Sequence, residues 1–262
     1  MRRTYREVSS KEYWETRWSN VDLDSQLSNL NVYPLKYAEM VVGRSDGAIL
    51  EVGCGAGRVL RYYHNREIKI TGIDYIQSVV DRLKNEDTTL DVRCGDICNL
   101  EYSDGTFNCV LAFGVYHNLD DKVHTALTET ARVLRPEGKL CASFRADNWQ
   151  TRLNDWIEDV RRTKNRKVAN RVFHKLNLKK NEFEKLLVEH DFSIEEIFPV
   201  VNMPILYKFR LFRFASHKNF NEELGRKEGY RLNTVGKVIQ RVLMAFFPDQ
   251  FCNVYVCIAR RC

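Results

Sequence analysis

Three glycines at alternate positions, with a carboxylate just before them, are the residues of this chain whose chemistry is easiest to interpret. An apolar run over 48–52 leads into Gly53, Gly55 and Gly57, and a helical pattern begins directly afterwards. Glycine lacks a Cβ, so such a strand-to-helix turn lets a ligand lie against the backbone and face the first N–H groups of the helix. Glu51 stands two residues before the first glycine. The free N–H groups suit a carboxylate or phosphate, so the pattern predicts a ligand site of a kind shared by many nucleotide-binding folds.

A second acid stands where a ribose would be bound. The apolar segment 68–74 reads as a strand and ends at Asp74. A carboxylate about 20 residues beyond a glycine turn can accept hydrogen bonds from both ribose hydroxyls. Tyr75 and Ile76 come next in the chain. We therefore expect these two side chains to lie against an adenine ring.

Two further predicted strands also end in residues that could contact the ligand. The segment 90–96 ends at Asp96, which together with Ile97 is placed to accept hydrogen from an adenine amino group. The segment 107–114 carries Phe113 near its end. Because ligands of open α/β sheets bind outside the carboxyl ends of the strands, we expect all these side chains to meet at one edge.

In this order the motifs resemble the class I S-adenosylmethionine-dependent methyltransferases. The matching segments are E-V-G-C-G-A-G, G-I-D, G-D-I and F-N-C-V-L-A-F-G-V-Y-H-N-L, followed by L-R-P-E-G-K-L at 134–140. The resemblance runs from Tyr13 to Asn148, with a closing strand pair near the C-terminus. It implies a Rossmann-like α/β fold with a seven-stranded, mostly parallel sheet, an antiparallel last strand and helices on both faces. It also implies S-adenosyl-L-methionine as cofactor and S-adenosyl-L-homocysteine as product.

The resemblance assigns roles to the motif residues. Those matching Glu51 and the glycines hold the methionine part of the cofactor, while Tyr13 or Arg17 of a leading helix contacts its carboxylate, unless that helix merely packs on the core. The predicted cofactor-binding set is Tyr13, Arg17, Glu51, Gly53, Cys54, Gly55, Gly57, Asp74, Tyr75, Ile76, Asp96, Ile97 and Phe113. A dinucleotide is the weaker interpretation, because its turn is usually G-x-G-x-x-G and a carboxylate such as Glu51 would repel a pyrophosphate.

The loop after the fourth strand is the predicted catalytic element. His117 has the pKa class that suits proton removal near neutrality, and Tyr116 or Asn118 could orient an acceptor. The alternative is that His117 only caps the next helix or bonds a carbonyl. The other histidines expected at the surface are His124, His174, His190 and His217.

The residues directly after that strand narrow the type of acceptor. The segment A-F-G-V-Y-H at 112–117 stands where enzymes that methylate base amines or glutamine amides carry an Asn/Asp-Pro-Pro-aromatic motif. We therefore expect methylation of an oxygen or nitrogen of a small molecule. Three alternatives stay open: a lipid or quinone methyltransferase that docks on membranes, a non-catalytic S-adenosylmethionine-binding partner protein, and an enzyme acting on RNA. The last is the weakest, so a nucleic acid partner is disfavoured.

Composition sets further limits. The chain has 262 residues, of which 44% are hydrophobic, and carries a net charge of +6. No apolar run is long enough to span a bilayer and no hydrophobic leader begins the chain, which predicts a cytoplasmic protein. The eight cysteines form no C-x-x-C pair and have no histidine cluster beside them, so no metal site is predicted and reduced thiols are expected.

Alternating patterns position these residues in one domain. Strands are predicted over 48–52, 68–74, 90–96, 107–114, 139–144, 192–201 and 251–259, and helices over 58–64, 76–86, 120–134, 181–190 and 234–247. This alternation predicts a parallel sheet covered on both faces.

Five segments of this domain are distinguished. An N-terminal helical lid (1–45) precedes the cofactor-binding half (46–150), and a basic helical insertion (151–180) comes after it. The C-terminal half (181–262) contains a long insertion, 202–250, that is expected to cap the substrate side.

Overall fold

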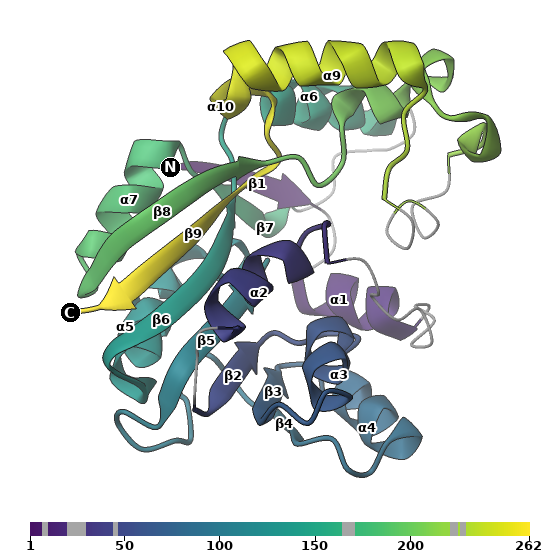
Figure 1. Cartoon of the computed structure of the whole chain (residues 1–262). Helices are drawn as coiled ribbons and strands as arrows, with labels where there is room; N and C mark the ends of the chain where they lie inside the picture. The colour runs from purple at the N-terminus through teal and green to yellow at the C-terminus, as the bar shows by residue number, and fades with distance from the viewer. Residues whose placement is uncertain (7–9, 20–29, 44–46, 164–170, 221–224, 226–228) are drawn as a thin grey trace.

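A seven-stranded sheet forms the centre of the protein. The computed structural model describes residues 1–6, 10–19, 30–43, 47–163, 171–220, 225 and 229–262. In chain order the strands of this sheet are β2 (Ile49–Val52), β3 (Ile70–Asp74), β4 (Val92–Cys94), β5 (Phe107–Phe113), β6 (Leu134–Arg145), β8 (Phe192–Val200) and β9 (Val254–Arg261). Their spatial order is β4-β3-β2-β5-β6-β9-β8 (Figure 1). β2 to β6 pair in parallel, whereas β9 is antiparallel to both of its neighbours. The predicted fold class is confirmed.

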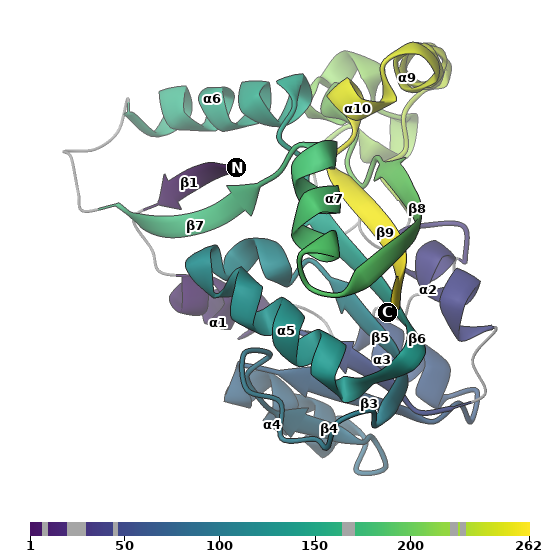
Figure 2. The same cartoon turned by 90° about the vertical axis from the view of Figure 1, so that its left-hand side faces the viewer.

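Helices cover both faces of the sheet. One face packs against α2 (Leu35–Val42), α3 (Arg58–His64) and α4 (Gln77–Glu86). The other packs against α5 (Val123–Val133) and α7 (Lys180–Val188). Figure 2 shows α5 and α7 on one side of the strands and α2 on the opposite side. Because both faces are covered, the central strands β2 and β3 are buried at every position.

The local pattern explains why each segment forms its element. In α4 the side chains of Val79, Val80 and Leu83 are buried while the polar residues between them face solvent, which is the spacing of a helix with one apolar stripe. β3 instead is buried at every position, as expected of a strand inside a parallel sheet. Periodicity therefore distinguishes the helices from the strands here.

A small second sheet lies outside the main one. β1 (Arg2–Arg6) pairs antiparallel with β7 (Val172–Asn177), and α6 (Trp149–Thr163) lies above this ribbon (Figure 2). The helical predictions for the first residues and for the end of the 151–180 insertion were wrong at these two strands. The partners are about 170 residues apart in sequence, so neither segment contains the pairing that stabilises it.

The long connection between β8 and β9 lies over one end of the sheet, with α6 beside it (Figure 1). It contains the short 3₁₀ helices η3 (Ile205–Lys208), η4 (Arg210–Phe212) and η5 (Ala215–His217), then α9 (Thr234–Phe246) and α10 (Pro248–Phe251). α9 begins at Asn233, whose Oδ1 accepts the Gly236 N–H at 2.8 Å. Trp149 of α6 packs on Phe251 of α10 with ring centroids 5.5 Å apart. Within the described residues, no helix is both long enough and apolar enough to cross a membrane.

Most of the cysteines are buried. All eight carry free thiols, and those at 54, 109, 141, 252 and 257 are buried in the core. Burial raises the pKa of Cys109 to about 12. Such a thiol stays protonated and acts as a small apolar side chain.

One glycine of the turn is required for packing. At Gly57, φ is +67° and a Cβ would lie 2.8 Å from Cδ2 of Leu83. Gly57→Ala is therefore expected to lower the free energy of unfolding by about 2 kcal/mol or more, through left-handed strain plus overpacking. Gly105→Ala is the matched control, because φ there is +64° but a Cβ would come no nearer than 3.9 Å to its closest neighbour, Arg135 Cα. Equal losses in thermal unfolding would contradict a packing role.

Candidate active site

A cavity of about 920 Å³ lies at the carboxyl ends of β2, β3 and β5. Its lining includes most of the predicted cofactor residues, namely Glu51, Gly53, Cys54, Asp74, Tyr75, Ile76, Asp96, Ile97 and Phe113. The cavity also extends past His117 to α6 and β7 and up to the connection between β8 and β9. The main sheet thus brings together motifs that are up to about sixty residues apart in the sequence.

The glycine turn has left-handed backbone at each of its three glycines. The φ angles are +65° at Gly53, +51° at Gly55 and +67° at Gly57, values that side chains with a Cβ rarely adopt. At Gly53 a Cβ would lie 2.4 Å from Cγ2 of Val115. Gly53 lines the cavity, whereas Gly55 and Gly57 do not and act by shaping the turn.

Asp74 connects that turn to the end of β3. Its Oδ2 accepts the Gly55 N–H at 2.8 Å, and its Oδ1 accepts the Ile76 N–H at 2.9 Å. Burial raises the pKa of Asp74, and these two N–H groups oppose that rise. Asp74 therefore holds the turn in place and also lines the cavity, where the ribose contact remains a prediction.

The predicted adenine contacts surround the next part of the cavity. The Tyr75 side chain is 57% exposed, while Ile76 and Ile97 are buried. Asp96 Oδ1 accepts the Cys98 N–H at 2.9 Å, which orients the carboxylate. These side chains come from the ends of two adjacent strands, as the sequence pattern predicts.

Glu51 has a buried carboxyl group, and one of its two oxygens makes no hydrogen bond to the described residues. Its Oε2 has no hydrogen-bond partner among the described residues. Burial raises the pKa of Glu51 to about 8, although the Leu60 N–H and the charge of Arg58 oppose the shift. A cationic group placed in the cavity would bring this pKa down. Arg58 also lines the cavity, and its place directly after the last glycine is the signal that sequence reasoning overlooked.

His117 lies in η1 (Tyr116–Asn118), immediately beyond β5. Its side chain is buried and lines the cavity, and its Nδ1 has no hydrogen-bond partner in the part of the chain that the structure describes. Burial lowers the pKa of His117 well below 6.5, and the charges of Lys175 and Arg145 lower it further. The imidazole is therefore neutral near pH 7 and can accept a proton.

Tyr116 is placed differently from what we expected. Its ring is fully buried, its hydroxyl bonds Oγ1 of Thr130 in α5 at 2.8 Å, and it does not line the cavity. Burial raises the pKa of Tyr116. Asn118 does line the cavity, where its Nδ2 donates to Gly114 O at 2.6 Å. A catalytic proposal at this loop consequently rests on His117.

The N-terminal helix contributes a residue other than the predicted ones. In α1 (Ser10–Ser19), Trp14 lines the cavity, whereas Tyr13 packs edge-on against His174 at 5.4 Å. The Arg17 side chain lies outside the described residues. His174 and His217 are buried, so the expectation that they lie at the surface was wrong. His174 belongs to a strand whose pairing was not visible in the sequence.

Tyr33 is a lining residue that sequence reasoning missed. Its hydroxyl bonds Oγ of Ser143 at 2.8 Å, and its ring packs edge-on against Phe113 at 5.7 Å. Burial raises the pKa of Tyr33 to about 12. It lies in a loop far from every motif, so no local pattern marks it. Other missed lining residues are Arg145, Asn154, Lys175, Lys208 and Tyr230.

The protein has a Rossmann-like α/β fold with a cavity at the carboxyl ends of its parallel strands. The family profile described as "Methyltransferase domain" matches residues 50–142. The 27-O-demethylrifamycin SV methyltransferase of Amycolatopsis mediterranei is 30% identical over 112 residues, 40% of this chain and 41% of that protein. The ubiquinone biosynthesis O-methyltransferase of Coxiella burnetii is 24% identical over 127 residues, 47% of this chain and 54% of that protein. The aligned part thus spans about half or less of each of these relatives.

Solved structures agree on the architecture. A SAM-dependent methyltransferase from Archaeoglobus fulgidus matches with a TM-score of 0.57 at 16% identity, covering 96% of this chain and 95% of that one. A likeness at this identity concerns the fold. The profile and the relatives add that residues 50–142 are similar to the methyltransferase domain of S-adenosylmethionine-dependent methyltransferases.

The residues present fit this cofactor. The buried Oε2 of Glu51, which has no hydrogen-bond partner among the described residues and lines the cavity with Gly53, suits a ligand that carries an ammonium group. When bound, the cofactor supplies a methyl group on a sulfonium. In this chain Glu51 would bind its ammonium group, Asp74 its ribose, and Asp96 its adenine.

Glu51→Gln should separate binding from stability. Because the pKa of Glu51 is raised from 4.5 to about 8, the folded protein retains a proton that the unfolded chain releases, so stability falls as pH rises from 4.5 to 8. The glutamine variant should lack this fall and be relatively more stable at pH 8. Its affinity for S-adenosylmethionine at pH 8 should drop about 10- to 100-fold through loss of a charge-assisted hydrogen bond.

Calorimetry and thermal unfolding between pH 5 and 9 measure both effects. Glu101→Gln, at an exposed position outside the cavity, is the control and should behave like the unaltered protein. Equal cofactor affinity in the Glu51 variant would place the ammonium group elsewhere.

Proposed function

We propose that this protein transfers the methyl group of S-adenosylmethionine to an oxygen or nitrogen of a small-molecule acceptor. The observation that carries the proposal is the single continuous lining that joins the predicted cofactor contacts to His117 and then continues between α6 and β7. This lining leaves room for a second molecule beyond the methyl donor. Small-molecule sites are typically concave and of this size.

For methyl transfer the protein mainly has to align the acceptor with the methyl group and provide a base that removes the acceptor's proton. Methyl transfer is an in-line displacement at a carbon that the sulfonium already activates, and orientation alone can supply about 7–11 kcal/mol of the barrier. His117 is neutral near pH 7 and can take the proton of an acceptor hydroxyl or ammonium. Asn118 on the same loop can orient the acceptor.

Two segments outside the cofactor motifs would exclude water. Trp14 and Tyr33 line the cavity from the N-terminal side, and Met203, Lys208 and Tyr230 line it from the connection between β8 and β9. We propose that segments 1–45 and 202–250 act as covers, as their positions in the sequence suggest. A dry site strengthens the electrostatic contacts made inside it.

The relatives support an enzyme and a small acceptor. The A. mediterranei protein is named for 27-O-demethylrifamycin SV, and the C. burnetii protein for O-methylation in ubiquinone biosynthesis. A non-catalytic S-adenosylmethionine-binding role is less favoured, because a buried neutral base faces the cavity where such a protein would need none.

Turnover tests the proposal directly. Purified protein incubated with methyl-labelled S-adenosylmethionine and a fractionated cell extract should place label in the polar small-molecule fraction. His117→Gln should reduce the transfer rate about 10²- to 10⁴-fold, the usual contribution of a general base, with cofactor affinity unchanged.

His124→Gln is the matched control, since His124 is exposed on α5, and it should transfer label at the normal rate. If no fraction accepts label while the cofactor still binds, a non-catalytic role replaces the enzyme. If His117→Gln transfers label normally, this residue is not the base.

A lipid or quinone acceptor is favoured by one feature of the surface. Along α9 the exposed apolar side chains recur as Val235, Val238, Val242 and Phe246, a stripe on one helix face. Lys237 and Arg241 border this stripe, and α9 contains no acidic residue. An apolar face edged by basic residues is typical of helices that lie in a membrane interface.

Sedimentation with anionic liposomes at low salt separates the two acceptor classes. A lipid or quinone enzyme should sediment, and Val238→Asp should abolish this by placing a charge in the stripe. Val188→Asp, at a comparably exposed position of α7, is the control. Protein that stays in the supernatant removes the membrane version of the function.

A further inference from the structure

The described lining of the cavity carries six basic and three acidic side chains, and Arg58 is a basic one beside Glu51. The acidic residues among its described lining are Glu51, Asp74 and Asp96, all in the predicted cofactor half. Beyond His117 the lining includes the basic side chains of Arg145, at the end of β6, and Lys175, on β7, and it includes no acidic side chain among the described residues. A cationic methyl donor suits the acidic residues of the cofactor half, and the two basic side chains beyond His117 can bind a negatively charged group.

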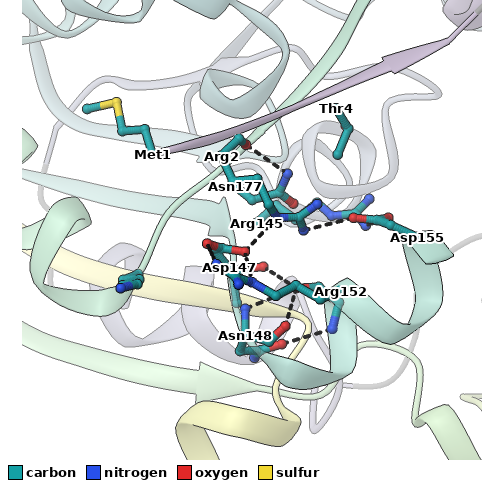
Figure 3. Close-up of polar contacts among 12 residues, drawn as sticks. Met1, Arg2, Thr4, Arg145, Asp147, Asn148, Arg152, Asp155 and Asn177 are labelled. Carbon is teal, nitrogen blue, oxygen red and sulfur yellow. Dashed lines mark hydrogen bonds and ion pairs between the residues drawn. The ribbon is translucent and has the colours of Figure 1, made fainter.

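Arg145 is held in place by a network of ion pairs that contains more arginines than aspartates. Its Nη2 donates to Asp155 of α6, which also accepts Nη2 of Arg2 at 2.8 Å. Arg2 Nε donates to Asp147 at 2.6 Å, and Asp147 also pairs with Arg152 at 2.8 Å. Figure 3 shows these side chains together between β1, α6 and the end of β6. Among the described residues, three arginines thus share two aspartates, which leaves a net positive charge.

β7 holds Lys175 beside this network. The Leu178 N–H donates to Arg145 O at 3.0 Å, which fixes the end of β7 against the end of β6. From the other side Thr4 Oγ1 of β1 donates to Lys175 O at 3.2 Å. Burial and then the charges of Lys175 and Arg145 lower the pKa of His117. The two cations are therefore close enough to act on the imidazole.

Two buried polar atoms of residues that line this part of the cavity have no hydrogen-bond partner among the described residues. His117 Nδ1 and Asn154 Oδ1 have no hydrogen-bond partner within the described ranges of the chain. Both residues are more than nine-tenths buried and both line the cavity. A buried polar atom without a partner is costly, so such atoms commonly mark the place of a polar ligand.

We propose that Arg145 and Lys175 bind an oxyanion of the acceptor, a carboxylate or a phosphate ester, and that this contact sets the orientation in which the acceptor meets the methyl group. The inference rests on the proposed methyl transfer and names the acceptor class. Arginine presents paired N–H donors to an oxyanion, and lysine adds a point charge. Asn154 Oδ1 then accepts from a donor group of the same molecule. The bound anion also raises the pKa of His117, which makes the imidazole a stronger base.

The charge of the labelled product is the first test. After transfer from methyl-labelled S-adenosylmethionine in cell extract, the product is applied to an anion-exchange resin at pH 8. Retention and release by salt are expected, and phosphatase treatment distinguishes a phosphate ester, which it releases, from a carboxylate, which stays bound. A labelled product that passes through unretained overturns the inference and leaves methyl transfer standing.

Substitutions at Lys175 test the site itself. Lys175→Gln should raise KM for the purified acceptor at least tenfold, with the affinity for S-adenosylmethionine unchanged, and Lys175→Arg should restore most of the loss. Lys84→Gln, on the exposed side of α4, is the control for removal of one charge. An unchanged KM in Lys175→Gln overturns the proposal.

A binding measurement without turnover tests the anion site independently of the proposed methyl transfer. The protein saturated with S-adenosylhomocysteine is titrated with benzoate and with phenyl phosphate, and with benzamide as the uncharged analogue. At least one anion should bind ten times more tightly than benzamide, and Lys175→Gln should remove the difference. Binding of this kind without any label transfer would refute the enzyme and keep the anion site. Equal binding of all three probes overturns the anion site.

Discussion

The carboxylate of Asp74 is the point on which the arrangement of the cavity depends. It accepts the N–H of Gly55 from the glycine turn and the N–H of Ile76 from the start of α4. These bonds link the ends of β2 and β3, two adjacent parallel strands, through one buried group. Ordering a loop of three glycines costs much conformational entropy, and these bonds offset that cost together with the bonds from the Cys54 N–H to Ile73 O and from the Gly57 N–H to Cys54 O. Each oxygen of Asp74 already accepts one N–H from the protein. A ribose would have to donate to the lone pairs that these bonds leave free, so both the turn and the predicted ribose contact depend on the position of this side chain.

Burial is the common cause of the unusual protonation states around the site. It keeps Glu51 protonated up to about pH 8 and His117 neutral down to a pH well below 6.5. An acid and a base are thus both uncharged near pH 7 until a ligand supplies compensating charge. A cationic donor would favour the ionised form of Glu51, and an anionic acceptor would favour the protonated form of His117.

The motifs could be predicted because each is local. A strand that ends in G-C-G-A-G, and acids such as Asp74 and Asp96 at the ends of the next strands, are signals contained in a few consecutive residues. Parallel strands then bring them to one edge as a matter of topology. Tyr116 shows the limit of this reasoning. It is adjacent to His117 in sequence, yet a 3₁₀ turn directs one side chain into the core and the other into the cavity.

The sequence by itself determined the fold class, the family resemblance and the edge of the sheet where the cofactor motifs meet, because hydrophobic periodicity and glycine spacing act over short distances. Only the tertiary structure decided which charges lie beyond His117. Arg145 and Lys175 come together because β7 pairs with β1 and joins the end of β6, contacts between segments far apart in the chain. From the sequence alone, the basic segment that contains Lys175 resembles a solvated helix. Its strand pairing depends on a second, distant segment, and its burial depends on the whole fold, so neither can be predicted from the segment itself.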